Sequence, residues 1–553
     1  MENKTLAAHI ADFISDKNIP AVFQLSGGMI AFIIDAISKL ESVQVINNRH
    51  EQASGFAAEG LARVSGSPSV AFGTSGPGAT NLITAIASCY YDSTPVLFIT
   101  GQVAQNEIRK DKNQRQLGFQ ELNIADLAIH ITKKVYEPMT AIAVMRALED
   151  GWNLTLQGRR GPVLIDIPIN LQQEIFSYKR EAVKSTKEVP DLGEFPTLQV
   201  QKLLDKASYP LILAGGGIRS SDSTAEFRSL VEHSRIPFVA SLMGLDAIDQ
   251  KSPNFLGFIG SYGNRWANKS LEMCDLLIVF GSRLDIRQTG ADINQFISNK
   301  KIIRIDIDSF ELKGRIKADV RIRMSLLEAL QHFKTLNYKK SYSELKDKVL
   351  AVKKQYPQHL EQTNELVNNP NQIMQLISEK FKNVSGYVVD VGQHQMWAAQ
   401  SLELHGNQRF ITSGGMGAMG FALPASIGAA IATKSRWVVI IGDGCLQLSA
   451  AEMQTISHYN LPITICLMNN EQHGMVAQFQ EKNLDGRLIG TREGYSNPDF
   501  QTLAKAFGFK KTFKFYNSSD IANLEIFLSQ SGAEPIFIEL MIDNKAQALP
   551  KKT

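Results

Sequence analysis

The chain has 553 residues, more than a single hydrophobic core normally holds, so about three domains are expected. Its hydrophobic share of 44% and charged share of 20% are those of an ordinary globular protein. The net charge of +3 is small for this length and argues against a nucleic-acid-binding surface or a membrane patch. No apolar run approaches the ~20 residues of a membrane span, and the N-terminus lacks a secretory signal pattern. We therefore expect a cytoplasmic protein with no nucleic-acid or membrane partner.

Four cysteines show no CxxC spacing, and each lies in or beside an apolar segment: Cys89, Cys274, Cys445 and Cys466. We expect buried thiols in a reducing compartment rather than disulfides or a metal site.

Short apolar strands alternate with helical segments in the first part of the chain, up to about residue 173. This alternation is typical of parallel sheets covered by helices. We predict strands at residues 22–25, 43–48, 69–73, 96–100 and 162–168, with a helix over 52–63. The polar segment 181–196 holds two prolines and is predicted to be a linker.

The same alternation recurs in two further blocks. In the second block, strands and the turns after them are predicted at 210–217, 237–242, 276–283 and 301–308. In the third, they are predicted at 387–392, 438–444, 463–470 and 535–542. Residues 334–372, rich in Lys, Gln, Glu and Asn, are predicted to form a partly helical connection. We therefore predict an α/β protein of three doubly wound parallel-sheet domains, at 1–180, 196–335 and 370–553, whose similar architecture fits duplication.

The most informative segment joins a buried strand to a glycine-flanked acid. The apolar run 437–441 ends in Gly442-Asp443-Gly444, and after a helical stretch at 449–457 a second buried strand ends in Asn469-Asn470. Open parallel sheets place their ligands at the carboxyl ends of the strands. Carboxylate and amide oxygens are the ligands that Mg²⁺ shares with substrate phosphates. Gly-Asp-Gly alone occurs in any turn, but this pair predicts a Mg²⁺–diphosphate site.

Glu51 follows the predicted strand 43–48 and begins the helix after it. One interpretation is that the acidic side chain simply favours a helix N-terminus. The segment around it, Asn48 to Arg63 (NRHEQASGFAAEGLAR), together with the GDG…NN pair resembles the thiamine-diphosphate-dependent enzymes. From end to end the chain is similar to the acetolactate synthase catalytic subunits. The matching motifs are Gly27-Gly28, TSGPGATN (74–81), Gly101-Gln102, FQE (119–121), GRRGPVLIDIP (158–168), GQHQMWAAQ (392–400) and TSGGMGAMGFALPA (412–425).

The resemblance implies that thiamine diphosphate binds between two chains, which would form a homodimer or homotetramer. Glu51 would hydrogen-bond the aminopyrimidine ring and support proton loss from the thiazolium. Asp443, Asn470 and the Gln472 carbonyl would hold Mg²⁺. The other residues implied in cofactor binding are Gln393, His394, Met419, Gly442, Gly444, Gly474 and Met475. Met419 would hold the cofactor in its bent form, although a core methionine is the commoner role for this residue type.

The resemblance also implies the chemistry: pyruvate loses CO₂ and its remaining two-carbon unit adds to a second carbonyl compound. Gly28, Phe119, Gln120 and Lys133 match positions on the acceptor side. For Lys133 the alternative is a solvated surface lysine beside Lys134.

The middle domain resembles the FAD-binding domain of the same family. The implied residues are Arg159, Gly215, Gly216, Gly217, Leu242, Met243, Gly257, Arg283, Arg287, Asp306 and Ile307. Glycines after a strand allow close backbone approach to a pyrophosphate. A vestigial, empty domain is the alternative, and the arginines favour bound FAD. In this family the flavin has no net redox role in carboligation.

Two departures from the family bear on the acceptor. Phe479 stands where the family has a Trp that favours larger 2-keto acids. The loop 103–117 is longer and more charged, and Arg109, Lys112 and Arg115 either meet an anionic acceptor or decorate a surface loop. Two alternatives to acetolactate synthesis therefore stay open: transfer to a bulkier ketone such as a nucleotide-linked keto sugar, and a pyruvate-oxidase type of flavin oxidoreductase. A regulatory subunit is also left open.

Overall fold

The computed structural model describes residues 3–111, 113–178, 193–339, 341–362 and 366–550. It contains three six-stranded sheets, each flanked by helices, and every neighbouring pair of strands in these sheets is parallel. The predicted fold class is confirmed. Most of the predicted linker lies outside the described residues. In the described part of the chain, no helix is long and apolar enough to cross a membrane.

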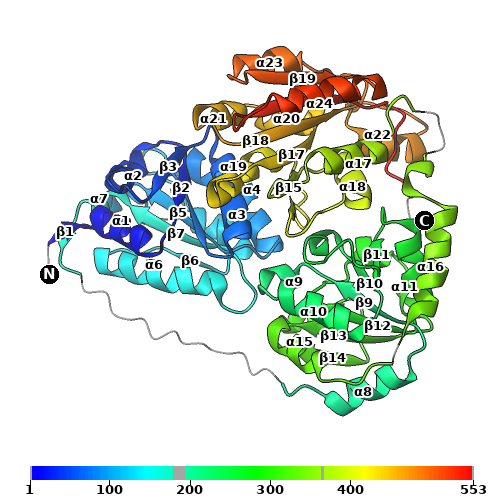
Figure 1. The fold of residues 1–553 in the computed structure, drawn as a ribbon. Helices are drawn as coiled ribbons and strands as arrows, with labels where there is room; N and C mark the ends of the chain where they lie inside the picture. The colour runs from blue at the N-terminus through cyan, green and yellow to red at the C-terminus, as the bar shows by residue number, and fades with distance from the viewer. Residues whose placement is uncertain (1–2, 112, 179–192, 340, 363–365, 551–553) are drawn as a thin grey trace.

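The first sheet, blue to cyan in Figure 1, has the order β3-β2-β4-β5-β7-β6. Its strands are β2 (Ala21–Gln24), β3 (Gln44–Asn47), β4 (Ser69–Gly73), β5 (Val96–Gln102), β6 (Lys134–Tyr136) and β7 (Val163–Pro168). Its main helices are α1 (Leu6–Asp16), α2 (Ala31–Ser38), α3 (Glu51–Ser65), α4 (Pro77–Tyr91), α5 (Ile124–Ala128) and α6 (Ala141–Leu156). A short antiparallel ribbon of β1 (Lys4–Thr5) and β8 (Ile175–Phe176) joins the two ends of this domain.

The middle sheet, green in Figure 1, has the order β11-β10-β9-β12-β13-β14. Its strands are β9 (Pro210–Ala214), β10 (Phe238–Ala240), β11 (Phe255–Phe258), β12 (Leu276–Phe280), β13 (Lys301–Asp306) and β14 (Val320–Arg323). Its main helices are α8 (Thr197–Lys206), α9 (Gly217–Ser220), α10 (Thr224–Ser234), α11 (Arg265–Met273), α15 (Leu326–Lys334) and α16 (Ser343–Gln355). Helix α16 packs on α11 and buries Leu345 and Val349 in this domain, so part of the predicted connection 334–372 belongs to the middle domain.

The third sheet, at the top of Figure 1, has the order β16-β15-β17-β18-β20-β19. Its strands are β15 (Gly386–Val389), β16 (Arg409–Thr412), β17 (Trp437–Gly442), β18 (Ile463–Asn469), β19 (Lys511–Phe515) and β20 (Ile536–Met541). Its helices are α17 (Pro370–Lys380), α18 (Gln393–Ser401), α19 (Ala422–Thr433), α20 (Asp443–Ser449), α21 (Glu452–His458), α22 (Gly474–Asn483), α23 (Phe500–Ala506) and α24 (Ile521–Ser529). The helix predicted at 449–457 is therefore wrong at its start, because helix already begins at Asp443 and is interrupted between α20 and α21.

In each sheet the chain adds strands on both sides of the initial strand, so the direction of strand addition reverses there. In the first and third sheets it also reverses near the far edge, because β7 lies inside β6 and β20 lies inside β19. In the first and third sheets the initial strand pairs with the second and third strands of its domain, so the reversal lies between β2 and β4 and between β15 and β17. In the middle sheet the initial strand pairs with the second and fourth, so the reversal lies between β9 and β12. Ligands of open α/β sheets bind at the carboxyl ends of the strands at this place.

Helices α3 and α19 hold the first and third domains together at the centre of the molecule (Figure 1). A Cβ at Gly60 would overlap the Ala425 carbonyl oxygen, and a Cβ at Gly428 would overlap the Ala57 carbonyl oxygen. The two helix backbones therefore touch directly, because neither glycine has a side chain to separate them.

Candidate active site

Asp443 lies at the carboxyl end of β17, where it is the first residue of α20. Its side chain is 2% exposed, and its Oδ2 accepts a 2.9 Å hydrogen bond from Asn497 Nδ2. Burial raises the pKa of Asp443, although hydrogen bonds from Asn497 and Tyr495 act in the opposite direction. A carboxylate buried in this way gains from a neighbouring cation, which offsets its loss of water.

A second oxygen donor lies at the end of the adjacent strand, β18. Asn470 donates through Nδ2 to Gln393 Oε1 at 3.1 Å, so its amide nitrogen is engaged and its amide oxygen is the group available to a cation. Asn497 Nδ2 also donates to Asn469 Oδ1 at 3.0 Å and so ties the ends of β17 and β18 together. A carboxylate and an amide oxygen at one sheet edge are hard ligands of the kind that Mg²⁺ takes.

The backbone around these ligands comes close to its neighbours at two glycines. A Cβ at Gly474 would overlap Gln393 Oε1, and a Cβ at Gly444 would overlap the His473 ring. Both glycines lie in the first turn of a helix, α22 and α20. Free backbone amides at helix N-termini bind phosphate groups.

His394, in the first turn of α18, adds a buried polar atom. Its Nε2 is buried and has no hydrogen-bond partner among the described residues. Burial lowers the pKa of His394 to about 3, so the ring is neutral at physiological pH. In the tautomer with a proton on Nε2, a neutral imidazole donates to an anionic oxygen. The oxygen donors, the two helix N-termini and this free nitrogen fit a diphosphate with its Mg²⁺.

The remaining residues predicted near the diphosphate lie on neighbouring segments. The Gln472 carbonyl accepts from Gly474 N at 2.9 Å, immediately before α22. Met475 and Phe479 lie on α22 itself, and the Phe479 side chain is 52% exposed. Met419 is partly buried and packs against the core that the first and third domains share.

Glu51 lies at the corresponding edge of the first sheet, as the first residue of α3. It is buried, and its Oε2 accepts a 3.0 Å hydrogen bond from Asn81 Nδ2 on α4. The turn before it is fixed by the third domain, because Glu452 accepts from Asn48 Nδ2 at 2.9 Å and from Arg49 N at 2.7 Å. Asn81 thus holds the Glu51 carboxyl group, and the third domain holds the backbone turn that precedes it.

Two of the predicted acceptor-side residues lie near Glu51 on the same edge. Gly28 begins the turn after β2, where Met29 N donates to Thr74 Oγ1 at 3.2 Å. Gln120 has a left-handed backbone (φ 66°), and its Cβ lies 3.0 Å from the place a Cβ on Gly76 would occupy. Phe119, beside it, is 82% exposed.

The structure does not bring Lys133 to this edge. Lys133 precedes β6 and lies at the amino end of the parallel sheet, where its Nζ donates to the Gln157 carbonyl. Burial lowers the pKa of Lys133 to about 8. The side chain is therefore neither the fully solvated lysine of one hypothesis nor a neighbour of Glu51.

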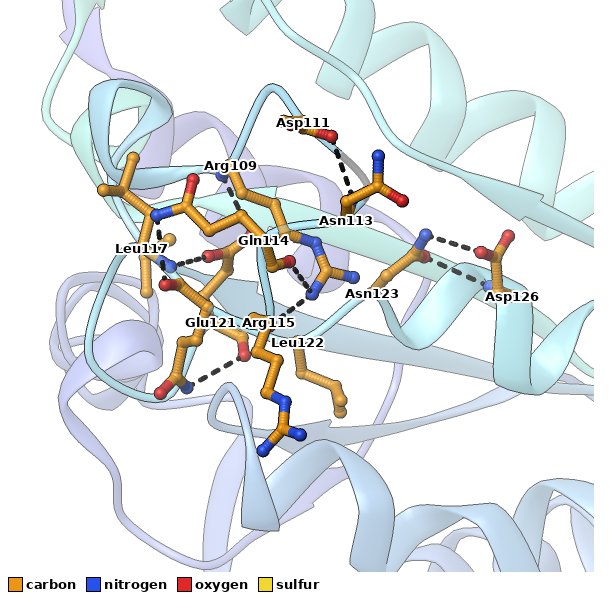
Figure 2. A network of polar contacts seen from close by, with 12 residues as sticks. Arg109, Asp111, Asn113, Gln114, Arg115, Leu117, Glu121, Leu122, Asn123 and Asp126 are labelled. Carbon is orange, nitrogen blue, oxygen red and sulfur yellow. Dashed lines mark hydrogen bonds and ion pairs between the residues drawn. The ribbon is translucent and has the colours of Figure 1, made fainter.

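The charged loop 103–117 is folded around one acid, as Figure 2 shows. Glu121 is buried and accepts from Arg109 N at 2.9 Å and from Leu117 N at 2.6 Å. The Arg109 guanidinium is directed back into the loop, where it donates to the Gln114 carbonyl at 3.2 Å. Arg115 points away from this network in Figure 2, and Lys112 lies outside the described residues. Arg109 thus stabilises the loop, and Arg115 points outward from it.

A cavity of about 540 Å³ lies where the three domains meet. Nine of the eleven residues predicted to bind FAD line it: Arg159, Gly216, Gly217, Leu242, Met243, Arg283, Arg287, Asp306 and Ile307. Gly215 and Gly257 do not line it. A Cβ at Gly215 would overlap the Gly281 carbonyl, so this glycine allows the ends of β9 and β12 to meet at the reversal point. The cavity is of a size usual for cofactor sites.

The arginines of this cavity differ in their bonding. Arg159 crosses from the first to the middle domain and pairs with Asp308 at 3.1 Å and Glu311 at 2.8 Å. In the part of the chain that the structure describes, the Arg283 guanidinium has one ion-pair contact, a long one of 3.6 Å with Asp285. Burial raises the pKa of Asp306 to about 6. A dinucleotide in this cavity would therefore meet Arg283 and Arg287 more freely than Arg159.

The first and third domains share one wall of the cavity, built on Asp92. Asp92 accepts from the amides of Gly414 at 3.0 Å and Gly415 at 2.7 Å, and Arg63 pairs with it at 2.6 Å. These glycines begin the segment that leads to Met419. One continuous segment therefore forms part of the cavity wall and leads to Met419, the residue predicted to hold the cofactor in its bent form.

Several residues of the site were not predicted. Asn81, Asn497 and Tyr495 contact the two key carboxylates, and Asp390 accepts three backbone hydrogen bonds, from Val391, Gly420 and Ala422. Asp390 follows the apolar run 387–389, so an acid at a strand end was a signal present in the sequence. Asn497 lies in an irregular segment after α22, where no pattern distinguishes it.

Three sequence families match the chain. They are described as "Thiamine pyrophosphate enzyme, N-terminal TPP binding domain" (residues 4–127), "central domain" (198–333) and "C-terminal TPP binding domain" (390–540). The acetolactate synthase isozyme 1 large subunit of Escherichia coli K12 is 34% identical, over 99% of this chain and 95% of its own length. The acetolactate synthase large subunit of Lactococcus lactis is 35% identical, over 97% and 92%. The chloroplastic acetolactate synthase 2 of Nicotiana tabacum is 32% identical, over 98% and 82%.

Proposed function

The chain belongs to the thiamine pyrophosphate enzymes, and within that family we propose that it is an acetolactate synthase, joining two pyruvates into 2-acetolactate and CO₂. Similarity to acetolactate synthase large subunits along nearly the whole chain supports this activity. The observation that carries it is the pair of sheet edges: a held carboxyl at Glu51 on one, and the buried oxygen donors around Asp443 on the other.

The third domain would hold the charged end of the cofactor. We propose that Asp443, Asn470 and the Gln472 carbonyl bind Mg²⁺, and that His394 Nε2 with the amides near Gly444 and Gly474 bind the diphosphate. When bound, thiamine diphosphate supplies the carbon nucleophile that lets pyruvate lose CO₂. Gln393 and the glycines Gly442 and Gly444 shape the space in which it would lie.

Glu51 would exchange a proton with the ring nitrogen of the cofactor. Asn81 holds Oε2, so Oε1 is the oxygen left for this exchange; it faces the turn at Gly78, where a Cβ would lie 3.3 Å from it. A positioned proton-transfer group of this kind contributes about 10²- to 10⁴-fold to a rate. Gly28, Phe119, Gln120 and, from α22, Phe479 would then shape the acceptor side, and Lys133 takes no part at this edge.

The assembly we propose is a homodimer or tetramer with the active sites between chains. Four large apolar side chains in the segment 117–129 of the first domain are exposed: Leu117, Phe119, Leu127 and Ile129. Exposed apolar patches commonly mark interfaces. A partner chain over this patch would cover Phe119 and close the acceptor side.

We also propose that FAD occupies the cavity between the three domains. Two pyruvates and one acetolactate plus CO₂ are at the same overall oxidation level, so the flavin would stabilise the domains rather than carry electrons. Purified protein should then be yellow, and anaerobic pyruvate should not bleach it as substrate is consumed. A colourless protein that FAD cannot reconstitute would remove the flavin from the proposal.

The activity itself is tested with pyruvate as the sole substrate. Protein supplied with thiamine diphosphate, Mg²⁺ and FAD should release CO₂ and 2-acetolactate in equal amounts. Pyruvate consumption that requires oxygen, or the absence of acetolactate in a protein that binds the cofactor, would contradict the proposal.

A further inference from the structure

A second cavity, of about 600 Å³, lies at the amino edge of the third sheet. Its lining comes mainly from the segments that precede β15, β16 and β17, and the middle domain closes it with Arg219. The diphosphate site lies at the carboxyl edge of the same sheet. This cavity therefore occupies the opposite edge, in the seam between the middle and third domains.

The lining of this cavity is cationic. Arg219, Lys382 and Arg409 contribute positive charge to it, and among the described residues no carboxylate lines it. Asn383, Ser385 and Asn407 add neutral polar groups. Oxyanions are bound by clusters of this composition, in which guanidinium and ammonium groups donate charge-assisted hydrogen bonds.

One acid behind the lining serves two arginines from different domains. Asp246 pairs with Arg409 Nε at 2.6 Å and with Arg219 Nε at 3.5 Å. A third guanidinium, Arg228, donates to Asn407 Oδ1 at 2.8 Å and to the Ile248 carbonyl at 3.2 Å. Two guanidinium groups thus share a single carboxylate at the seam, and a third, that of Arg228, lies near Arg219.

The cationic cluster has hydrogen-bonding capacity left over. Arg228 Nε is buried and has no hydrogen-bond partner among the described residues, and the 3.5 Å contact of Arg219 Nε with Asp246 is an ion pair without a hydrogen bond. Burial and the neighbouring Arg409 and Arg228 lower the pKa of Arg219, while Asp246 opposes that change. Both observations indicate a positive cluster that lacks compensating negative charge.

We propose that this cavity binds a small phosphate-bearing anion that bridges the middle and third domains. Arg219 from the middle domain and Lys382 and Arg409 from the third domain would contact its oxygens. The bound anion would supply the negative charge that Asp246 alone does not, and so would stabilise the seam. Arg219 and Arg409 also line the 540 Å³ cavity, whereas Lys382 and His405 line only the second one, so Lys382 is the proposed contact that distinguishes this site.

The test uses the whole protein, saturated with thiamine diphosphate, Mg²⁺ and FAD so that the other anion sites are filled. Inorganic phosphate is titrated while the melting temperature is followed, and its affinity is measured by calorimetry. Lys382 is exposed, so Lys382→Glu should fold normally and should weaken phosphate binding about tenfold, as expected for loss of one charged hydrogen-bond donor. The matched control is Lys202→Glu, which changes an exposed lysine of α8 and should leave phosphate affinity unchanged.

The result expected is a saturable rise in melting temperature with phosphate in the wild type and in Lys202→Glu, shifted to higher concentration in Lys382→Glu. Succinate, a dicarboxylate, is the second arm and should bind more weakly than phosphate. The proposal is overturned if phosphate gives no saturable effect, or if Lys382→Glu binds it as well as the wild type does. Tighter binding of succinate would overturn the assignment to phosphate.

Discussion

The first and third domains share one strand order but present different chemistry at the same edge. At the first edge a single acid, Glu51, is held by Asn81 and by backbone contacts to the third domain. At the third edge Asp443 is one member of a connected set of oxygen donors and amides. The topology therefore decides where a ligand binds, and the side chains decide whether the edge moves a proton or holds a charge.

The middle domain differs from both, because its strand order is different and its edge carries arginines together with acids. Its reversal point lies where Gly215 and Gly281 meet, and the cavity there is shared with both neighbouring domains. The three sequence blocks resemble one another, which suggested duplication. Their strand orders show that the detailed similarity holds only between the first and third domains.

The largest effect is expected at the first edge. Glu51→Gln should lower turnover about 10²- to 10⁴-fold, because an amide cannot take the proton, while thiamine diphosphate affinity changes little. Turnover and cofactor affinity are measured together, with Glu41→Gln on the surface of the same domain as control. If Glu51→Gln kept near wild-type turnover, Glu51 would not be the proton-transfer group. The proposed difference between the first and third edges would then be contradicted.

At the third edge, loss of a ligand should act on binding instead. Asp443→Ala should weaken Mg²⁺-dependent cofactor binding by more than about 100-fold, beyond the ~10- to 100-fold typical of groups that only orient a ligand. Removal of Mg²⁺ by a chelator should mimic the variant in the wild type. Titration of the cofactor with and without Mg²⁺ checks this, with the exposed Asp485→Ala as control; equal affinity would contradict the assignment.

A smaller loss is expected for the residue that orients Asp443. Asn497→Ala should weaken cofactor binding by about 10-fold, because the carboxylate loses a 2.9 Å hydrogen bond but stays in place. Gln447→Ala is the matched control, since Gln447 bonds Asn497 without touching Asp443. Equal effects of the two substitutions would mean that the network acts as a whole rather than through Asn497.

The smallest effect concerns Phe479 on α22. An indole offers more apolar contact than a phenyl ring, so Phe479→Trp should raise the preference for 2-ketobutyrate over pyruvate as acceptor by about 1 kcal/mol, at the low end for such contacts. The ratio of products in competition assays measures it, and Phe310→Trp on the exposed surface is the control. An unchanged ratio would place Phe479 outside the acceptor side.

The predicted strands were those buried within the sheets, together with the edge strand β3. The strands without a prediction, β6, β11, β14, β16 and β19, all lie at sheet edges. Lys511–Phe515 shows why: its residues are mostly half-buried and alternate in polarity, so no continuous apolar run identifies it. Strands in the middle of a sheet are covered on both faces, so their residues form a continuous apolar run that is recognisable in the sequence.

The site residues that could be predicted are likewise those that follow recognisable strands. Asp443 comes directly after the buried strand β17, and Glu51 follows the edge strand β3 after three residues, so the sequence alone predicted both at a ligand edge. Asn497 reaches Asp443 from an irregular segment, and its position depends on tertiary folding. The motif match predicted Lys133 on the acceptor side, whereas within this chain it precedes β6 at the amino end of the sheet, because a motif match carries no information on which end of a strand a residue occupies.

The backbone contact of α3 with α19 has a genetic consequence. An added methyl group at Gly60 or Gly428 would overpack the crossing, at a cost of about 1 to 3 kcal/mol. Alanine alleles at these positions should be conditional, supporting growth in the cold and failing on warming. Their suppressors should map to the facing helix, where trimming a neighbour restores the spacing, and not to the residues that carry out the reaction.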